Sequence, residues 1–488
     1  MTVTATNSCR GWLLVALCCV PLVNVAQVEA QSSVTETDAE ETALRAIGDL
    51  QQLVIDAIAR CEPSVVAIAR GLSGDQDVLL DPNAIPPDFA TGVIIDRSGL
   101  ILTNYHAIGD PRQHDYAVWV HRRGYRAEVH GADPYYDLAV LKIEAPELVP
   151  IEFGDASQLR KGQFVIALGN PLAIARDGNC SASWGMISNF GRKPPPERGT
   201  DENPAGKITV HHYGNLIQTD ARLELGTSGG ALLNLQGQMI GLTSSYAALH
   251  GYEQSAGFAI PVDDALRRVI DKLKEGDEAQ FGFLGIAPEQ LLAAHRARGW
   301  HGVRVGRVVN ATPAAAAGLL VDDVITHVGD QPVFDSDSLF LNISRFDVGR
   351  EVPLSVRRKK RELVLTVRLT KKFVAHPLPA ITATAPPSWQ GIQVDYATAL
   401  PRFEQRADDA DPQGCVAVTA VATDSPGWKA GLRPGHFISH VGQRRVSTPT
   451  DFFAILQQQI ATGEQVTLQL RVTVAVNGQL WVSVPINR

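Results

Sequence analysis

The chain has 488 residues, of which 45% are apolar and 20% are charged. This length predicts about three folded domains of ordinary size, and the composition excludes a disordered chain. A formal net charge of −8 argues against nucleic acid as a partner.

Residues 1–30 have the pattern of a secretory signal peptide. Arg10 precedes an apolar stretch, Gly11–Ala26, and Val28-Glu29-Ala30 supplies small residues for cleavage. We expect cleavage after Ala30 and a periplasmic or otherwise exported location, because the apolar run is short and Pro21 interrupts it. An uncleaved membrane anchor is the alternative, and no other stretch is long enough to predict a stable membrane span.

Cysteines do not provide a scaffold for this fold. Three of the six lie in the signal peptide, and the expected mature chain keeps Cys61, Cys180 and Cys415. An odd number of widely spaced cysteines allows at most one internal disulfide. Two states of the protease domain stay open, a Cys61–Cys180 pair and buried free thiols, of which the thiols are favoured.

Next comes an N-terminal segment, residues 31–62. Apolar residues at helical spacing over residues 41–60 predict an amphipathic helix. Ser64–Ala69 then begins the first strand, and prolines and glycines predict a loop over residues 71–89. From there to Ile260, short apolar strands alternate with turns, as in two packed antiparallel barrels.

Three motifs place a histidine, an aspartate and a serine among these strands. Gly92–Ile108 reads as two strands joined by a hairpin, with His106 near the end, and Asp133–Ile143 places Asp137 just before a buried strand. Gly226-Thr227-Ser228-Gly229-Gly230 puts a serine between glycines, which allows a tight turn. The order His, Asp, Ser is one of three known chain orders of the catalytic triad.

The chemistry of a serine protease assigns a role to each residue. Ser228 attacks the scissile carbonyl, and His106 takes its proton and passes it to the leaving amine. Asp137 holds the imidazole tautomer and stabilises the imidazolium. The oxyanion hole is predicted at Gly226, Thr227 and Ser228, with the N–H groups of Gly226 and Ser228 as donors. A plain glycine turn is the alternative for the serine motif alone.

Six blocks in this order and spacing resemble the HtrA-type (Deg) serine proteases: TNYHAI, DLAVLKI, ALGNP, IQTDA, GTSGGALLN and GFAIP. The resemblance covers roughly residues 50–488. It implies a mainly β fold, with a chymotrypsin-like protease domain of two barrels over residues 63–277, followed by two α+β PDZ domains. It also implies a homotrimer or higher oligomer, with contacts from the segment before the first strand.

Two departures from the family pattern lie beside the serine. Thr227 replaces the usual Asn and Ala231 the usual Pro, and neither change removes a donor or a catalytic side chain. Arg222, six residues before Ser228, lies where related proteases shape the primary specificity pocket. Without an Asp there, a trypsin-like preference is excluded, and the resemblance implies small aliphatic residues at the cleavage site. Whether Arg222 points into the pocket or into solvent stays open, with solvent favoured.

The rest of the protease region contains one unusual loop and one helix. Gly191–Gly214 is longer and more polar than in the family, and its three consecutive prolines mark a surface loop. His211 and His212 do not predict a metal site, because neighbours in a strand face opposite sides and no third ligand is near. We expect no metal and no cofactor. Pro261–Lys274, acidic early and basic late, predicts a closing helix.

The C-terminal half contains an internal repeat. Residues 312–333 and 425–446 align without a gap at an offset of about 113 residues. Both copies resemble HtrA-type PDZ domains, assigned to residues 278–372 and 389–488, with a Pro-rich linker at 373–388 as a semi-rigid spacer. Such a domain adds a C-terminal peptide as a strand to its sheet edge and captures the carboxylate with backbone N–H groups.

The two copies differ at the positions that would bind a peptide. Phe283-Leu284-Gly285-Ile286 resembles the carboxylate loop well, whereas Gln390-Gly391-Ile392 is a weaker match. The first copy has Asp322-Asp323 where the second keeps Pro434-Gly435. We expect the first PDZ domain to bind peptides and the second to be more structural.

These features predict an ATP-independent serine endopeptidase of the cell envelope. Its substrates are expected to be unfolded or damaged polypeptides, with regulation by C-terminal peptides in the PDZ domains. No nucleotide-binding G-x-x-x-x-G-K-[ST] run occurs in the sequence. One alternative is a chaperone or peptide-binding scaffold with a silent protease domain, which the complete triad disfavours. Another is a protease for one dedicated signalling substrate.

Overall fold

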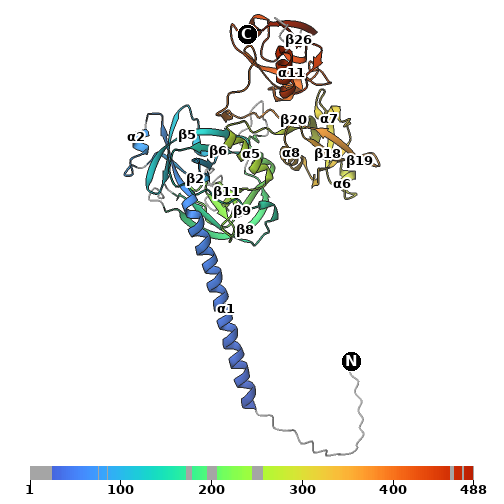
Figure 1. The fold of residues 1–488 in the computed structure, drawn as a ribbon. Coiled ribbons are helices and arrows are strands. Elements are labelled where there is room, and N and C mark those ends of the chain that lie inside the picture. Colours follow the sequence, from blue (N-terminus) through green and yellow to red (C-terminus); the bar gives the residue numbers. More distant parts are fainter. Residues whose placement is uncertain are drawn as a thin grey trace, which may run out of the picture. The chain divides into compact units, whose positions relative to one another are not determined.

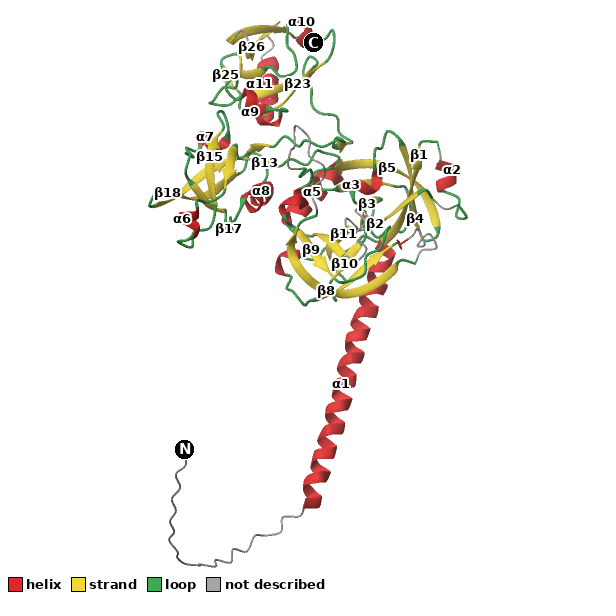
Figure 2. Cartoon of the chain, turned by 180° about the vertical axis from the view of Figure 1, so that it is seen from behind, coloured by secondary structure: helices red, strands yellow, loops and turns green. Residues whose placement is uncertain are grey.

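The computed structural model describes residues 25–74, 76–84, 86–171, 179–194, 206–244, 257–461, 467–474 and 478–486 (Figure 1). Most of the predicted signal peptide lies outside these residues. The chain divides into two compact units between Ile55 and Asp56. Strands predominate in the second unit (Figure 2).

The N-terminal helix, α1, is longer than predicted. It spans Val25–Cys61 and runs through the expected cleavage point, so that cleavage stays a prediction. In the first unit Leu44 and Ile47 are both 63% exposed. In the second unit the last turn buries Cys61, whose Sγ donates to the carbonyl of Gly237 at 2.8 Å. Within the described ranges, no helix is long and apolar enough to cross a membrane.

All three cysteines of the expected mature chain are free thiols in the structure. Burial raises the pKa of Cys61 to about 11 and the pKa of Cys180 and of Cys415 to about 12. At neutral pH these thiols are therefore protonated, and the reactive thiolate form is suppressed.

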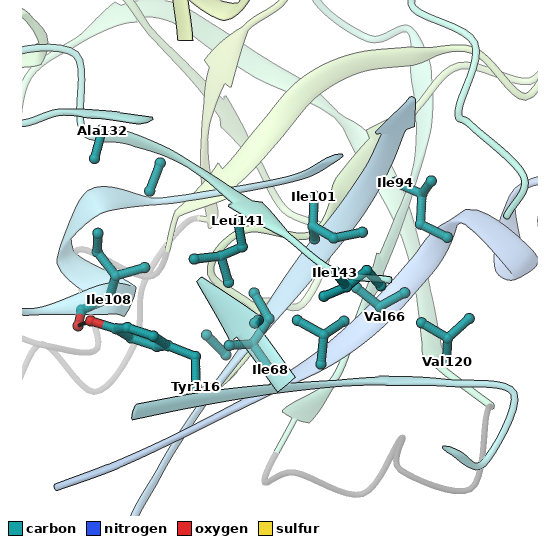
Figure 3. Packing of buried hydrophobic residues seen from close by; sticks show 14 of the residues in the cluster. Val66, Ile68, Ile94, Ile101, Ile108, Tyr116, Val120, Ala132, Leu141 and Ile143 are labelled. Carbon is teal, nitrogen blue, oxygen red and sulfur yellow. Dashed lines mark hydrogen bonds between the residues drawn. The ribbon is translucent and has the colours of Figure 1, made fainter. Parts of the chain in front are cut away.

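The first barrel closes because β5 pairs with both β4 and β6, in the order β5-β4-β1-β2-β3-β6. Val66, Ile68, Ile101 and Leu141 point into its core (Figure 3). The elements are η1 (Glu62–Ser64), β1 (Val65–Leu72), α2 (Gln76–Leu79), β2 (Asp88–Asp96), β3 (Leu100–Thr103), α3 (Tyr105–Ile108), β4 (His114–Val120), β5 (Arg123–Asp133) and β6 (Leu138–Lys142). The region predicted as a loop after residue 71 thus contains α2.

The second barrel is closed in the order β10-β11-β12-β9-β8-β7. Its elements are η2 (Ala156–Gln158), β7 (Phe164–Gly169), β8 (Ser181–Arg192), η4 (Val210–Tyr213), β9 (Leu216–Thr219), β10 (Ala231–Leu233), β11 (Met239–Ser244) and β12 (Gly257–Pro261). The predicted closing helix is α5 (Asp264–Glu275). Asp263 caps its first turn by accepting the N–H of Leu266, and left-handed Gly276 ends it.

The first PDZ domain has a sheet of order β14-β15-β16-β18-β19, in which β14 is an edge strand. Its elements are β13 (Gly282–Phe283), β14 (Ile286–Glu289), α6 (Ala293–Arg296), β15 (Val303–Val308), α7 (Pro313–Ala316), β16 (Val324–Val328), β17 (Gln331–Pro332), α8 (Ser336–Ser344), β18 (Glu351–Arg358), β19 (Arg361–Arg368) and β20 (Thr370–Lys371).

The second PDZ domain repeats this plan, with a sheet of order β22-β23-β24-β26-β27. Its elements are β22 (Ile392–Tyr396), η5 (Ala397–Ala399), α9 (Phe403–Arg406), β23 (Val416–Val421), α10 (Pro426–Lys429), β24 (Phe437–Val441), β25 (Arg444–Arg445), α11 (Pro449–Ala461), β26 (Thr467–Val474) and β27 (Gly478–Pro485). Each PDZ domain has its own core of buried aliphatic residues.

The Pro-rich segment between the PDZ domains packs against the first barrel. It contains β21 (Ile381–Thr382), which pairs with β5 so that Ile381 lies opposite Ala132. Leu378 and Ile381 pack against the core of that barrel. Tyr105 Oη also donates to the carbonyl of Pro379 at 2.9 Å. The segment therefore adds a seventh strand to the sheet.

Candidate active site

The site starts from a half-buried histidine and a buried aspartate on the first barrel. His106 lies in the one-turn helix α3, directly after β3, and Asp137 lies in the turn before β6. His106 Nδ1 is 2.8 Å from Oδ2 and 3.0 Å from Oδ1 of Asp137, and Oδ1 also accepts the backbone N–H of His106 at 2.9 Å. The carboxylate therefore fixes both the ring and the backbone of the histidine.

Asp137 itself is held by its surroundings. Its backbone is left-handed, with φ 57°, and its carbonyl accepts the N–H of Tyr105 at 3.1 Å. Asn104 Nδ2 donates to Asp137 Oδ2 at 3.3 Å. Burial favours the neutral acid, but the charge and the N–H groups of His106 outweigh it and hold the pKa of Asp137 below its usual value. Asp137 is therefore the ionised partner of the pair.

The serine turn lies on the second barrel, between β9 and β10, and one threonine of the first barrel joins it. The N–H of Thr91, on β2, donates to the carbonyl of Ser228 at 2.9 Å, and Thr91 Oγ1 donates to the carbonyl of Gly226 at 2.7 Å. The same Oγ1 accepts the N–H of Asn170 at 2.7 Å. Sequence reasoning did not single out Thr91. Its only signal was one polar residue within the apolar strand FATGVII.

Two positions of the turn require glycine. Gly226 has φ 95°, and a Cβ there would lie 2.7 Å from the ring of Phe89; Gly229 has φ 84°, and a Cβ there would lie 2.1 Å from the carbonyl oxygen of Thr91. One predicted oxyanion group needs correction, because the N–H of Thr227 donates to the carbonyl of Glu224 at 3.1 Å. That donor is used inside the turn, which leaves Gly226 and Ser228 as candidates.

A cavity of about 200 Å³ lies beside this turn, with Thr227, Leu168 and Ser183 among its lining residues. Arg222 also lines it. The side chain of Arg222 is 81% exposed and its Nη2 is 2.6 Å from Glu224 Oε1. This ion pair keeps the guanidinium at the surface, in agreement with the solvent-facing interpretation.

His211 and His212 lie in η4, not in a strand. His211 Nε2 is 2.8 Å from the carbonyl oxygen of Tyr136, so this ring supports the turn that carries Asp137. Burial lowers the pKa of His211, which is therefore neutral at pH 7. His212 Nδ1 is 2.9 Å from Thr209 Oγ1. In the described part of the chain, no group of three or more His, Cys, Asp or Glu residues could hold a metal ion.

The predicted carboxylate loop of the first PDZ domain has a fixed backbone. The carbonyl of Leu284 accepts the N–H of Ala314 at 2.8 Å, and the carbonyl of Gly285 accepts the N–H of Val309 at 3.0 Å. Phe283 lies in β13, opposite Thr370. The side chains of Leu284 and Ile286 belong to the domain core. A peptide would therefore meet the backbone of this loop, and the side chains of Leu284 and Ile286 support it from beneath.

Two closed barrels, with a His–Asp pair on one and a serine in a glycine turn on the other, are the architecture of the chymotrypsin-like serine proteases. Family models match the chain accordingly: a trypsin-like peptidase domain at residues 90–242 and PDZ domains at residues 282–369 and 417–472. The chain belongs to the DegP-like, HtrA-type family and is a serine endopeptidase.

Similar proteins and solved structures support this assignment. The chain is 31% identical to a protein of Chlamydia muridarum named "Probable periplasmic serine endoprotease DegP-like", over 78% of this chain and 71% of that protein. It is 27% identical to the periplasmic serine endoprotease DegP of Salmonella typhimurium, over 76% and 72% of the two chains. A solved structure of the HtrA-type protease AlgW with a tripeptide has 27% identity and a TM-score of 0.50, over 67% of this chain and 98% of that one. An AlgW variant solved with a decapeptide gives 26% identity and the same TM-score.

Proposed function

We propose that Ser228, His106 and Asp137 form the catalytic triad of an ATP-independent endopeptidase that cuts unfolded proteins in the periplasm. The observation that carries this proposal is the buried, doubly bonded contact between Asp137 and His106. An ionised carboxylate at Nδ1 fixes the tautomer whose Nε2 is basic, as a general base for a serine requires. The periplasmic location follows the names of the relatives.

The proposed reaction gives each of these residues one role. Ser228 Oγ attacks the scissile carbonyl while His106 Nε2 accepts its proton, and Asp137 stabilises the imidazolium that forms. The N–H groups of Gly226 and Ser228 stabilise the negative oxygen of the tetrahedral intermediate. His106 then gives the proton to the leaving amine. Water, deprotonated by His106, attacks the acyl-enzyme ester, and Ser228 Oγ leaves and takes the proton back as the acid product is released.

Peptide capture by the first PDZ domain is proposed as the regulatory input. Its fixed loop backbone and edge strand β14 suit the addition of a C-terminal chain end. The AlgW structures, solved with a tripeptide and a decapeptide, support peptide binding by this chain. Association into a homotrimer or larger oligomer is supported by exposed apolar residues of α1, Leu44 and Ile47.

The test is cleavage of reduced casein without ATP by the wild type and by Ser228→Ala, with and without a hydrophobic C-terminal peptide. We expect wild-type cleavage that the peptide accelerates, and none by the variant. Asp137→Asn should lower kcat by about 10,000-fold, because the histidine loses its orienting carboxylate. The control is Ser73→Ala, which changes an exposed serine of the first barrel.

Two results would overturn the proposal in different ways. Cleavage by Ser228→Ala at the wild-type rate would show that another residue is the nucleophile. If wild type and variant both leave casein intact and suppress its aggregation, the triad is silent and the chain acts as a chaperone.

A further inference from the structure

The first PDZ domain offers a defined path for a bound chain beyond its carboxylate loop. β15 pairs with one side of β14 and leaves the other side open. The C-terminal end of α8 lies near the carboxylate loop, because the carbonyl oxygens of Ile343 and Phe346 are beside Gly282. The start of α8 lies near the far end of β14, because it lines one cavity together with Glu289. A peptide that enters at the loop and runs antiparallel to β14 therefore arrives at this cavity.

The cavity has a volume of about 520 Å³ and a mixed lining, in which apolar and aromatic side chains lie among polar ones. Leu291 and Val303 line it and are 6% and 1% exposed, and Trp300 and Phe334 are its aromatic lining residues. Phe334 is 64% exposed, although a large aromatic side chain is normally covered in a folded domain. A ligand side chain that covers this ring in the bound protein would explain why the ring is exposed in the free protein.

Contacts within the domain hold the aromatic lining in place. The ring of Trp300 stacks on His295 at 4.5 Å, and the guanidinium of Arg357 lies 4.5 Å from its centroid. The ring of His301, 5.5 Å from that of Phe334, is fixed by a hydrogen bond from Nδ1 to the carbonyl of Val333 at 3.0 Å. A preorganised lining of this kind lowers the entropy cost of binding.

Charges of both signs surround the cavity. Glu289, Asp335 and Asp337 supply three carboxylates, and Arg296 supplies one guanidinium. Asp337 is paired with Lys193 and Lys207, and Glu289 with Arg304. Asp335 caps α8 by accepting the N–H of Ser338 at 2.7 Å. The neighbouring cations therefore balance the carboxylates, and charge does not select the ligand side chain.

We infer that this cavity is a specificity subsite for an aromatic side chain located about three to five residues before the C-terminus of a bound peptide. The spacing follows from the four residues of β14, at about 3.3 Å per residue, that separate the carboxylate loop from the cavity. The inference rests on the proposed capture of C-terminal peptides by this domain, and it adds a sequence preference to that function.

The test uses the full-length Ser228→Ala chain, which binds peptides without cutting them. Fluorescently labelled eight-residue peptides share their last three residues and carry a single Phe, Ala or Glu at the fourth, fifth or sixth residue counted from the C-terminus. At one of these positions we expect Phe to bind about tenfold more tightly than Ala, since burial of about 60 Å² of ring surface corresponds to that ratio. Glu should bind no more tightly than Ala, because its carboxylate would lose hydration against the aromatic lining.

A pair of protein variants locates the effect. Phe334→Ala should reduce the affinity of the Phe peptide to that of the Ala peptide and leave the Ala peptide unchanged. Leu320→Ala is the matched control, because Leu320 is an exposed apolar residue of the same domain, 52% exposed, and does not line the cavity. It should leave all affinities unchanged.

The failures are distinguishable. If amidation of the C-terminus abolishes binding but the upstream residue makes no difference, the subsite is wrong and peptide capture stands. The subsite is also wrong if Phe334→Ala weakens the Phe and Ala peptides equally. If no peptide binds, or if amidated peptides bind equally well, capture by the carboxylate loop fails and the subsite fails with it.

Discussion

The two PDZ domains share a loop backbone and differ in whether that loop is open. In the first domain the carbonyls of Leu284 and Gly285 accept the N–H groups of Ala314 and Val309. In the second domain the carbonyls of Gln390 and Gly391 accept those of Gly427 and Ala422, at 3.1 and 2.8 Å. The carbonyl of Gly285 points toward β15. The N–H of Ile286 belongs to the same peptide unit and points the opposite way, toward the open edge of the sheet.

In the second domain the corresponding N–H is already used. Ile392 donates to the carbonyl of Trp389 at 2.8 Å, and Trp389 donates back to the carbonyl of Ile392 at 2.9 Å. In the first domain the segment before the loop, β13, pairs with β20 instead. The pairing of the preceding residues therefore decides whether a carboxylate loop is available, even where the loop backbone is the same.

The largest effect should come from a matched pair of glycine substitutions. Gly285 and Gly391 have φ 90° and 80°, and a Cβ at either would lie 2.3 Å from Cβ of Thr312 or Ser425. We expect Gly285→Ala to weaken peptide binding by about 100-fold, because the loop must move. Gly391→Ala should leave affinity unchanged, and anisotropy in the Ser228→Ala background measures both. Equal losses would mean that both domains bind peptide.

A smaller effect is expected at the turn before the third strand of each sheet. Asp322 and Gly435 are left-handed, with φ 70° and 88°, and donate their N–H groups to the carbonyls of Val305 and Val418. The structure thus aligns Asp322 with Gly435. Asp323, the next residue, is buried and receives two bonds from Arg358, at 2.8 and 2.7 Å.

Asp323→Ala should destabilise the first PDZ domain by about 2 kcal/mol, because it removes charge-assisted bonds and leaves the N–H of Leu320 without its acceptor. Hydrogen exchange followed by mass spectrometry measures the change segment by segment, and the second PDZ domain serves as the internal control. Unchanged protection in β16 and β18 would show that this ion pair contributes little.

The smallest effect concerns pH. His436 occupies the position of Asp323 in the second domain, and burial, with Arg406 and Arg433, lowers its pKa. The unfolded state then binds the proton more readily, so the second domain loses stability as pH falls below about 6.5, at no more than about 1.4 kcal/mol per pH unit. His436→Gln should flatten this slope in hydrogen exchange between pH 7 and 5. A slope unchanged by the substitution would assign it to other groups, and His440, whose pKa is also lowered by burial, would be the first to examine.

Much of this organisation was predictable from sequence because its signals are local. Strand alternation and turn residues indicated the barrels, and the gapless repeat indicated two similar domains. His106 and Asp137 were assigned from separate motifs, and the structure brings them to 2.8 Å. The serine motif predicted the turn but could not show that the N–H of Thr227 is used within it.

Features that depend on contacts between distant segments were not predictable in the same way. Thr91 acts across the two barrels, and its role depends on their packing. The closed loop of the second PDZ domain depends on a backbone pairing that residue types do not encode. The cavity in the first domain combines Trp300 with Phe334, which lie on separate connections of the chain.

The pairing of β21 with β5 can form only late in the synthesis of the chain. Ile381 pairs with Ala132, so β5 emerges from the ribosome about 250 residues before its outer neighbour. At about 5–20 residues per second, that interval lasts about 12 to 50 seconds. During this time Gly131 and Ala132 of β5 lack their partners in β21, and Tyr105, next to His106, lacks the carbonyl of Pro379. The first barrel can close before then through β5, β4 and β6, and β21 is added only after the first PDZ domain has been synthesised.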